Sequence, residues 1–201
     1  MKILDPHQSY TFSTLFEIKA EIDDLVADFD YKLSRTDLNL SQFPGELTGL
    51  SELHQKIKRI LPLVNLNTEI ARREILISRV VTEVVDYTQA QLRIEYPLKV
   101  SEQLQGNLDY LLRKDNQVIV IEAKKEDFVN GMKQLAVEMI ALDRWLEPGQ
   151  ETILGAITTG NFWQFAELDR TAKLIQLGLE NYRFPEDIES LLRILIQALI
   201  Q

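Results

Sequence analysis

Four consecutive β-branched residues, V-I-V-I at Val118–Ile121, constrain the fold of this chain more than any other stretch. Side chains in a strand alternate between its two faces, so a strand of this composition is apolar on both and must be buried on both. Residues 107–112 predict a neighbouring strand, and the polar residues 113–117 predict the turn between them. The segment 106–125 is therefore expected to form a β-hairpin inside a covered sheet.

Charged residues follow directly where this buried strand ends. Glu122 and Lys124 are expected on one face with Ala123 opposite, and Asp109 lies on the neighbouring strand, where it can sit beside them. Charges at the end of a buried strand are costly unless they meet a partner, a metal or water. Two interpretations follow. Lys124 pairs with Asp109 or Glu122 as a structural ion pair, or the two carboxylates hold a divalent cation beside a positive group.

The order of these charged residues also resembles a known family. Asp109, followed after about a dozen residues by Glu122-x-Lys124, is similar to the core of the PD-(D/E)xK nuclease superfamily, which includes restriction endonucleases and Holliday junction resolvases. The phrase V-I-V-I-E-A-K-K, with a helix after it, most resembles the amino-terminal nuclease domain of type I restriction motor subunits and small stand-alone relatives. Leu108 stands where the family name has proline. The resemblance covers Thr68 to about Leu177.

This resemblance implies a metal-dependent site at the end of the hairpin. In such a site Asp109, Glu122 and the backbone carbonyl of Ala123 would hold Mg²⁺ or Mn²⁺ through oxygen ligands. Lys124 would orient the attacking water or stabilise charge on the phosphate in the transition state. The implied activity is hydrolysis of DNA phosphodiester bonds by an endonuclease.

A helix before the sheet supplies a further acidic candidate. The sequence predicts this helix from an N-cap at Thr68 to about Tyr87. Its opening, T-E-I-A-R-R-E-I-L-I, resembles the segment that carries an additional acidic ligand in the family, which implies Glu69 as that ligand and Glu74 as the alternative. Glu69 has an equally simple explanation, a favourable interaction with the positive end of the helix dipole.

A helix after the sheet supplies a polar candidate. Asp127 is expected to cap this helix, which the apolar spacing predicts over residues 128–146. The resemblance implies Gln134 or Lys133 as a further site residue, and Gln134 fits better because Glu138 follows it as in the family pattern Q-x-x-x-[E/Y]. The alternative is an exposed polar residue on an amphipathic helix.

The order of predicted elements indicates an α/β (α+β) fold, with a central mixed sheet flanked by helices and a restriction endonuclease-like core. We expect a helical N-terminal appendage over residues 1–66, the core over 67–183, and a C-terminal amphipathic helix over 184–201. Within the appendage, helical periodicity covers Thr14–Leu33. The apolar stripe of the last helix is expected to dock on the sheet or on a second copy. Further strands are predicted at 92–100, 152–159, 162–168 and 173–177, with a two-residue turn at Gly160–Asn161.

Composition narrows the possible functions. The chain of 201 residues is long enough for one domain with a sizeable core. It has no cysteine, which excludes disulfides and thiolate sites and fits a cytoplasmic location. No apolar run is long enough to span a membrane. The net charge of −9 opposes broad nonspecific DNA affinity but leaves room for a local basic cleft.

The sequence therefore predicts a Mg²⁺- or Mn²⁺-dependent nuclease with DNA as its partner. The alternative is a catalytically silent nuclease-like domain that binds nucleic acid or a protein in a restriction or repair assembly. A homodimer or a protein partner is expected through the N-terminal helices or the C-terminal helix.

Overall fold

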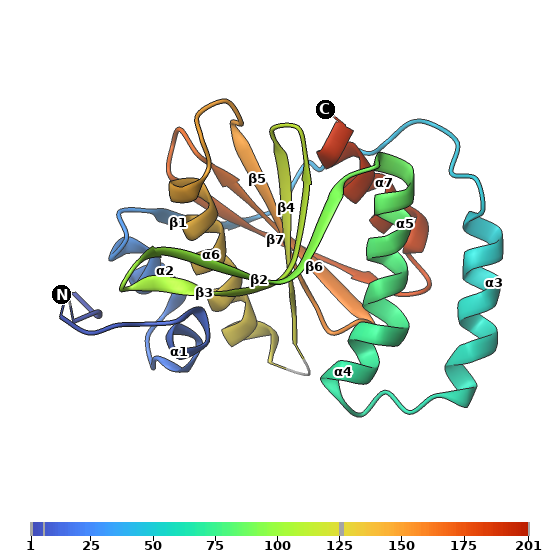
Figure 1. Cartoon of the computed structure of the whole chain (residues 1–201), viewed down its shortest axis with the longest axis horizontal. Coiled ribbons are helices and arrows are strands. Elements are labelled where there is room, and N and C mark those ends of the chain that lie inside the picture. The colour runs from blue at the N-terminus through green and yellow to red at the C-terminus, as the bar shows by residue number, and fades with distance from the viewer. Residues whose placement is uncertain (1, 6, 125–126, 201) are drawn as a thin grey trace.

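A single seven-stranded mixed sheet forms the centre of the fold (Figure 1), which confirms the predicted α+β class. The computed structural model describes residues 2–5, 7–124 and 127–200. The strand order is β1-β7-β6-β5-β4-β3-β2. The strands are β1 (Lys32–Thr36), β2 (Gln91–Ser101), β3 (Leu104–Lys114), β4 (Gln117–Ala123), β5 (Thr152–Thr158), β6 (Phe162–Asp169) and β7 (Leu174–Arg183).

The predicted hairpin is present as β3 and β4. These strands pair antiparallel, with Tyr110 opposite Ile121 and Lys114 opposite Gln117. Strand β4 then pairs parallel with β5, and the helix between them makes the crossover that a parallel pair requires. The V-I-V-I run is buried on both faces, as predicted.

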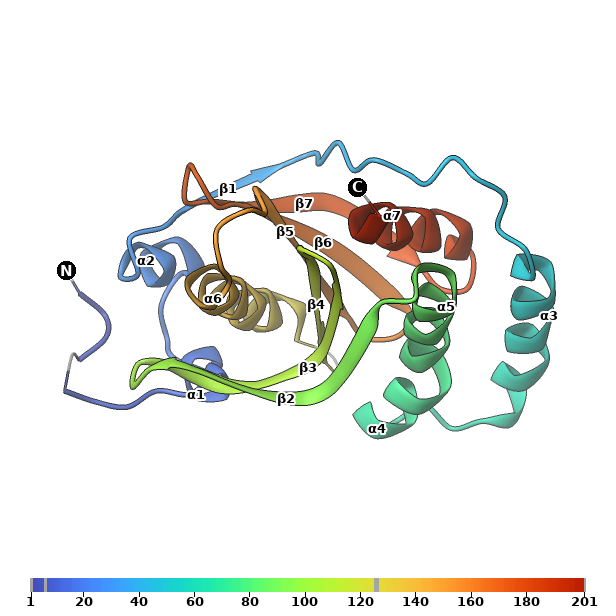
Figure 2. The same cartoon turned by 45° about the horizontal axis from the view of Figure 1, so that its top comes forward.

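Helices cover both faces of the sheet (Figure 2). Helix α6 lies in the concavity of the curved sheet together with α1 and α2, while α5 and α7 lie on the opposite face. The helical segments are α1 (Phe12–Glu17), α2 (Ile22–Ala27), α3 (Leu50–Ile60), the 3₁₀ turn η1 (Leu61–Leu63), α4 (Glu69–Arg72), the π-helical segment η2 (Arg73–Ile77), α5 (Ser78–Thr88), α6 (Phe128–Trp145) and α7 (Ile188–Ile200).

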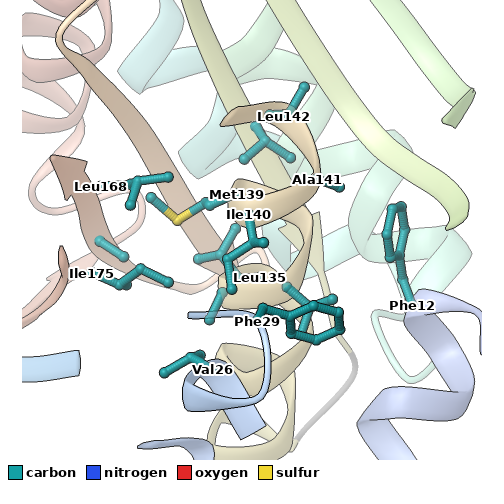
Figure 3. Packing of buried hydrophobic residues seen from close by; sticks show 14 of the residues in the cluster. Phe12, Val26, Phe29, Leu135, Met139, Ile140, Ala141, Leu142, Leu168 and Ile175 are labelled. Carbon is teal, nitrogen blue, oxygen red and sulfur yellow. The ribbon is translucent and has the colours of Figure 1, made fainter. Parts of the chain in front are cut away.

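Helix α6 is the centre of the larger hydrophobic core. Side chains from α1, α2, the sheet and α6 meet around it, including Phe12, Val26, Phe29, Leu168 and Ile175 (Figure 3). Most described α6 side chains from Met132 to Asp143 are buried, whichever side of the helix they occupy. Because a helix that is buried on all sides has no water-facing stripe, its polar residues must find partners inside the protein.

The second core lies under α5 and α7. The apolar stripe of α7 packs against the sheet. Docking on the sheet was one of the two expected arrangements, and docking on a second copy was the other. The buried members of that stripe are Ile188, Leu191, Leu192, Ile194, Leu195, Ile196 and Leu199. This face of α7 is therefore buried within the chain itself, so the apolar surface on which a partner was expected to bind is already covered.

The N-terminal part differs from the prediction. One helix was expected over Thr14–Leu33, but α1 ends at Glu17, α2 begins at Ile22, and Lys32–Thr36 is strand β1. Strand β1 pairs parallel with β7 at the edge of the sheet.

The expected boundary of a helical appendage at residue 66 is accordingly wrong for the described residues up to Thr36. They contribute strand β1 to the sheet and several side chains to the core around α6. Helix α3 stands away from the sheet (Figure 1), and Ile57 is its buried residue. Helix α3 ends at Ile60, before Pro62, as predicted.

Strand β2 is an edge strand and contains Pro97, which suits that position. Glu95 has a φ of 52°, and the register with β3 shifts between Lys99 and Ser101. Such irregularities bend a strand, and Ile94 on β2 is 54% exposed. Among the described residues, no helix combines the length and the apolar character that crossing a membrane requires.

Candidate active site

The end of β4 brings together the charged residues that the sequence singles out. Tyr110 is paired with Ile121, so Asp109 stands one residue further along, opposite Glu122. The Ala123 backbone N–H donates to Asp109 Oδ2 at 2.8 Å, which fixes the carboxylate beside the end of β4. The hairpin register therefore positions Asp109 as predicted.

Lys124 links the sheet to helix α6. Its Nζ lies 2.6 Å from Glu122 Oε1 and donates to Gln134 Oε1 at 2.9 Å. Gln134 Nε2 in turn donates to Glu138 Oε1 at 2.8 Å, one helical turn further along. Glu122 and Lys124 share a face, as the alternation predicts, and a continuous polar chain runs from the strand into the helix.

The cluster is open at one side. The side chains of Asp109 and Lys124 are 15% and 19% exposed, whereas that of Glu122 is 1% exposed. Glu138 is fully buried. A ligand from solvent therefore meets Asp109 and Lys124 first, and Glu122 forms the floor of the site.

A second cation, Arg73, borders the site from the helical side. Its Nη1 lies 2.6 Å from Glu95 Oε1 and 3.3 Å from Asp109 Oδ1, and the guanidinium stands over the Tyr110 ring. Arg73 is the first residue of the π-helical segment η2. Such single-turn π segments shift the phase of a helix and are frequent at functional sites.

Burial and mutual repulsion keep the two acidic residues easy to protonate. Burial raises the pKa of Asp109, against the Ala123 N–H and the Arg73 charge, which lower it. Burial and then the charge of Asp109 raise the pKa of Glu122 to about 7, although Lys124 opposes both effects. A cation placed between these carboxylates would remove this repulsion.

Glu138 adds a third buried carboxyl group. Burial and then the charge of Glu122 raise its pKa well above the ordinary value. Glu122 Oε2 and Glu138 Oε2 are buried, and no hydrogen-bond partner is recorded for either among the described residues. Because the charge of Glu122 raises the pKa of Glu138, we expect one of the two carboxyl groups to be protonated.

Lys124 stays positively charged in this environment. Burial lowers its pKa, but the charge of Glu122 and the hydrogen bond to it outweigh burial, so the pKa of Lys124 is raised. The ammonium also lies 5.0 Å from the centre of the Phe16 ring on α1. A permanently charged Lys124 can stabilise an anion, but it cannot accept a proton as a general base at neutral pH.

Four predicted residues thus meet at one point, namely Asp109, Glu122, Lys124 and Gln134. The prediction that Gln134 is an exposed residue is wrong, because it is buried and bonded to Lys124 and Glu138. Lys133, the alternative, points elsewhere and donates to the Ile18 carbonyl oxygen. Lys125, the last residue of the quoted motif, lies outside the described residues.

The helix glutamates are not joined to this cluster. Thr68 caps α4 as predicted, with its Oγ1 accepting from the Ala71 N–H, and Glu69 is half-buried in the first turn. Glu74 is exposed. Within the described part of the chain, no hydrogen bond or ion pair is recorded between either glutamate and the residues of the cluster. Their proposed role as metal ligands remains a prediction.

Two members of the site were not predicted. Glu138 is four residues after Gln134, so the helical period places both on one face, and that spacing was the available signal. Arg73 is the first residue of a π-helical segment, which shifts the phase of a helix. A regular 3.6-residue period carries no information about such a shift.

The donor set fits a magnesium or manganese ion held by few protein groups. Among the described residues, no group of three or more His, Cys, Asp or Glu side chains is arranged to hold a metal ion. Mg²⁺, however, is commonly bound through one or two carboxylates, with waters and substrate phosphates as its other ligands. Asp109 and Glu122, with the carbonyl of Ala123, which follows Glu122 in the chain, supply such a hard-oxygen set, and the repulsion between the two carboxylates favours a cation.

Neither a protein-family model nor a curated protein matches the chain. The resemblance to the PD-(D/E)xK nucleases is therefore a hypothesis based on the motif and on the geometry of these residues.

Proposed function

We propose that this protein is a divalent-cation-dependent nuclease that hydrolyses DNA phosphodiester bonds at the end of β4. One observation carries the proposal. Two neighbouring strands place Asp109 and Glu122 beside a charged lysine, and the two side chains reached from solvent are one carboxylate and one ammonium. A phosphodiester needs this combination of anionic cation ligands and a positive group.

Each residue of the cluster then has a distinct task. Asp109 and Glu122, with the Ala123 carbonyl, would hold Mg²⁺ or Mn²⁺, which when bound supplies Lewis-acid polarisation of the scissile phosphate. Lys124 binds the phosphate and stabilises the negative charge that grows on it in the transition state. Gln134 positions Lys124 through its Oε1, and Glu138 holds the Gln134 amide from the other side.

Arg73 and Lys124 also hold the acidic side chains in place before a substrate arrives. Arg73 contacts Asp109 Oδ1, and Lys124 contacts Glu122 Oε1. When a cation takes over these oxygens, both positive side chains become available to a phosphate. The site therefore contains the two positive groups that a polyanion needs, within a protein of net charge −9.

The proposal is tested by cleavage of plasmid and branched DNA with Mg²⁺ or Mn²⁺. Asp109→Asn and Lys124→Ala are expected to lower the cleavage rate by about 10²–10³ or more, since each removes a charge that acts on the transition state. Glu95→Gln is the matched control, because Glu95 contacts Arg73 but is half exposed and is no proposed ligand. Cleavage by either site variant at the wild-type rate, or cleavage in EDTA, would contradict the assignment.

A second candidate function is nucleic-acid binding without cleavage. The observation that favours it is the pairing of both carboxylates with Arg73 and Lys124, which leaves a self-neutralised site. Calorimetric titration with Mn²⁺ separates the two candidates. The nuclease is expected to bind the ion at a site that Asp109→Asn weakens at least about tenfold, and the silent domain is expected to bind none.

A further inference from the structure

A second hollow lies on the same face and at the same end of the sheet as the candidate active site. This cavity of about 290 Å³ is bounded by the α1–α2 connection, the first turns of α6 and the strands β1, β6 and β7. Its size is close to the lower end, roughly 300 Å³, of sites that bind small molecules. The first turns of α6 separate it from Lys124, because Gly131 packs on the lysine and Asn130 lines the cavity.

An irregularity in the sheet creates the cavity. Strand β6 pairs with β7 through Gln164–Asn181 and Ala166–Leu177, so Gly178–Glu180 bulges out opposite Phe165. The β1–β7 pairing also stops there, at Thr36 and Gly178. Bulges of this kind bend a strand and redirect side chains, and they are common next to functional sites.

The lining combines apolar surface with hydrogen-bonding groups. Ile22, Phe128, Met132, Leu177 and Leu179 form the apolar wall, and Asn130 and Gln164 supply amides. Gln164 Nε2 donates to the Gly178 carbonyl oxygen at 2.6 Å, and in the described part of the chain no donor to its Oε1 is recorded. A flat group with polar edges suits such a site better than an aliphatic group does.

Positive charge lines the same cavity. Lys133 is only 5% exposed, and its recorded acceptors are neutral, namely the Ile18 carbonyl oxygen at 2.8 Å and Asn130 Oδ1 at 3.2 Å. Arg35 is exposed, and no ion pair is recorded for it among the described residues. Glu21 also lines the cavity, and the positive charge of Lys133 is one of the smaller influences that lower the pKa of Asp127. A buried cation without a direct anionic partner favours an anion as the ligand.

We propose that this cavity binds one unpaired nucleotide of the DNA strand that the nuclease cuts. The apolar wall and the amides take the base, and Lys133 and Arg35 face its phosphate. This inference rests on the proposed function for the identity of the strand. It adds that the substrate has a single-stranded or flipped-out nucleotide, because a base paired in a duplex cannot enter a cavity.

The position of the cavity agrees with a strand that passes both sites. Strands β4, β5, β6 and β7 are consecutive in the sheet. Neighbouring strands are about 4.8 Å apart, so the end of β4 and the bulge in β7 are roughly 14 Å apart across the sheet. A DNA strand covers that distance with a few nucleotides, so one nucleotide can occupy the cavity while a phosphate further along reaches Lys124.

The test measures binding without cleavage. Fluorescence anisotropy in EDTA compares a labelled single strand of about ten nucleotides with the same strand carrying abasic positions, and with a blunt duplex. We expect the intact single strand to bind at least about tenfold more tightly than the abasic strand. Ala20→Trp, which fills the cavity, and Arg35→Ala are each expected to remove this difference. Arg113→Ala, an exposed arginine near the turn between β3 and β4, is the matched control.

Equal binding of intact and abasic strands by the wild-type protein would overturn the proposal, and so would unchanged binding by both cavity variants. Arg35→Ala keeps the test valid if Ala20→Trp does not fold, since Arg35 is exposed. A deoxynucleoside monophosphate is expected to compete only weakly. Competition stronger than that of the strand would assign the cavity to a free nucleotide instead.

This result is separable from the proposed cleavage. Base-dependent binding that Asp109→Asn leaves intact, together with no cleavage in Mg²⁺, would reject the nuclease and keep the nucleotide site. Cleavage that proceeds equally well on abasic strands and in the cavity variants would reject the nucleotide site and keep the nuclease.

Discussion

Ionising both Glu122 and Glu138 in the interior of this protein would be costly. Both groups are buried, both have raised pKa values, and each has one oxygen held by another side chain, Lys124 for Glu122 and Gln134 for Glu138. Neighbouring buried carboxyl groups cannot both ionise without a large cost. Because Glu122 is paired with Lys124, we expect Glu138 to be the residue that carries the proton.

Replacing Glu138 by glutamine tests this proton. A carboxyl group whose pKa is raised by folding binds more protons when folded, so stability falls as the pH rises above the ordinary glutamate pKa of 4.5. The glutamine amide cannot ionise at any pH. At pH 8 Glu138→Gln is therefore expected to be more stable than the wild type, which must either keep a proton on Glu138 or bury a second negative charge.

The measurement is the free energy of unfolding from urea titrations at several pH values. The difference between the two proteins should disappear below about pH 4.5, where the wild-type carboxyl groups are protonated in both states. A difference in unfolding free energy between the two proteins that stays constant from pH 4 to pH 8 would contradict a raised pKa of Glu138.

At the scale of elements, the candidate site depends on the close contact between α6 and the strands β4 and β5. A Cβ atom at Gly131 would lie 2.3 Å from Ile157 Cδ1 and 2.9 Å from Lys124 Cγ. The helix can therefore approach Lys124 closely enough for Gln134 to hold it only because residue 131 has no side chain.

Gly131→Ala is expected to destabilise the protein by about 1–3 kcal/mol, although alanine is the better helix former, because the core has no space for the methyl group. It should also lower the cleavage rate, since the added atom displaces Lys124. Gly155→Ala is the control, because its Cβ would meet Met139 Sδ on the same helix but not Lys124. Thermal unfolding and cleavage rates check both variants. Unchanged cleavage by Gly131→Ala would contradict the positioning of Lys124 by this contact.

The sequence predicted elements whose signals are local. The V-I-V-I strand, the face shared by Glu122 and Lys124 and the N-cap at Thr68 each follow from neighbouring residues, and the structure confirms them. The burial of Gln134 was not predictable, because it results from the curvature of the whole sheet around α6. Strand β1 was missed for a similar reason, since it pairs with β7, which is about 140 residues away in the chain.

At the scale of the whole molecule, one buried carboxylate joins three distant parts of the chain. Asp143 on α6 accepts from the Tyr31 hydroxyl at 2.5 Å, and it lies 2.7 Å from Arg170 Nε and 2.5 Å from Lys173 Nζ. Tyr31 precedes β1, and the two basic residues lie at the β6–β7 turn. This network connects the start of β1, helix α6 and the turn between β6 and β7.

Asp143→Asn is expected to destabilise the protein by about 3 kcal/mol, because it leaves two cations without their buried carboxylate. Burial raises the pKa of Asp143, but hydrogen bonds from Arg170, Lys173 and Tyr31 outweigh it, so the pKa is lowered. Its stabilisation is therefore present above the unfolded-state pKa and is lost as the pH falls. The control is Glu102→Gln, which breaks an exposed pair with Lys99 and should change unfolding little. Equal unfolding free energies of Asp143→Asn and the wild type at pH 7 would contradict this role.

A crystal structure of the protein soaked with Mn²⁺ tests the central claim most directly. The account predicts one anomalous scattering peak at the end of β4, with oxygens of Asp109 and Glu122 about 2.0–2.2 Å away and the contact to Arg73 Nη1 released. The absence of a peak there, with Asp109 still paired to Arg73 and Glu122 still paired to Lys124 at saturating Mn²⁺, would contradict it.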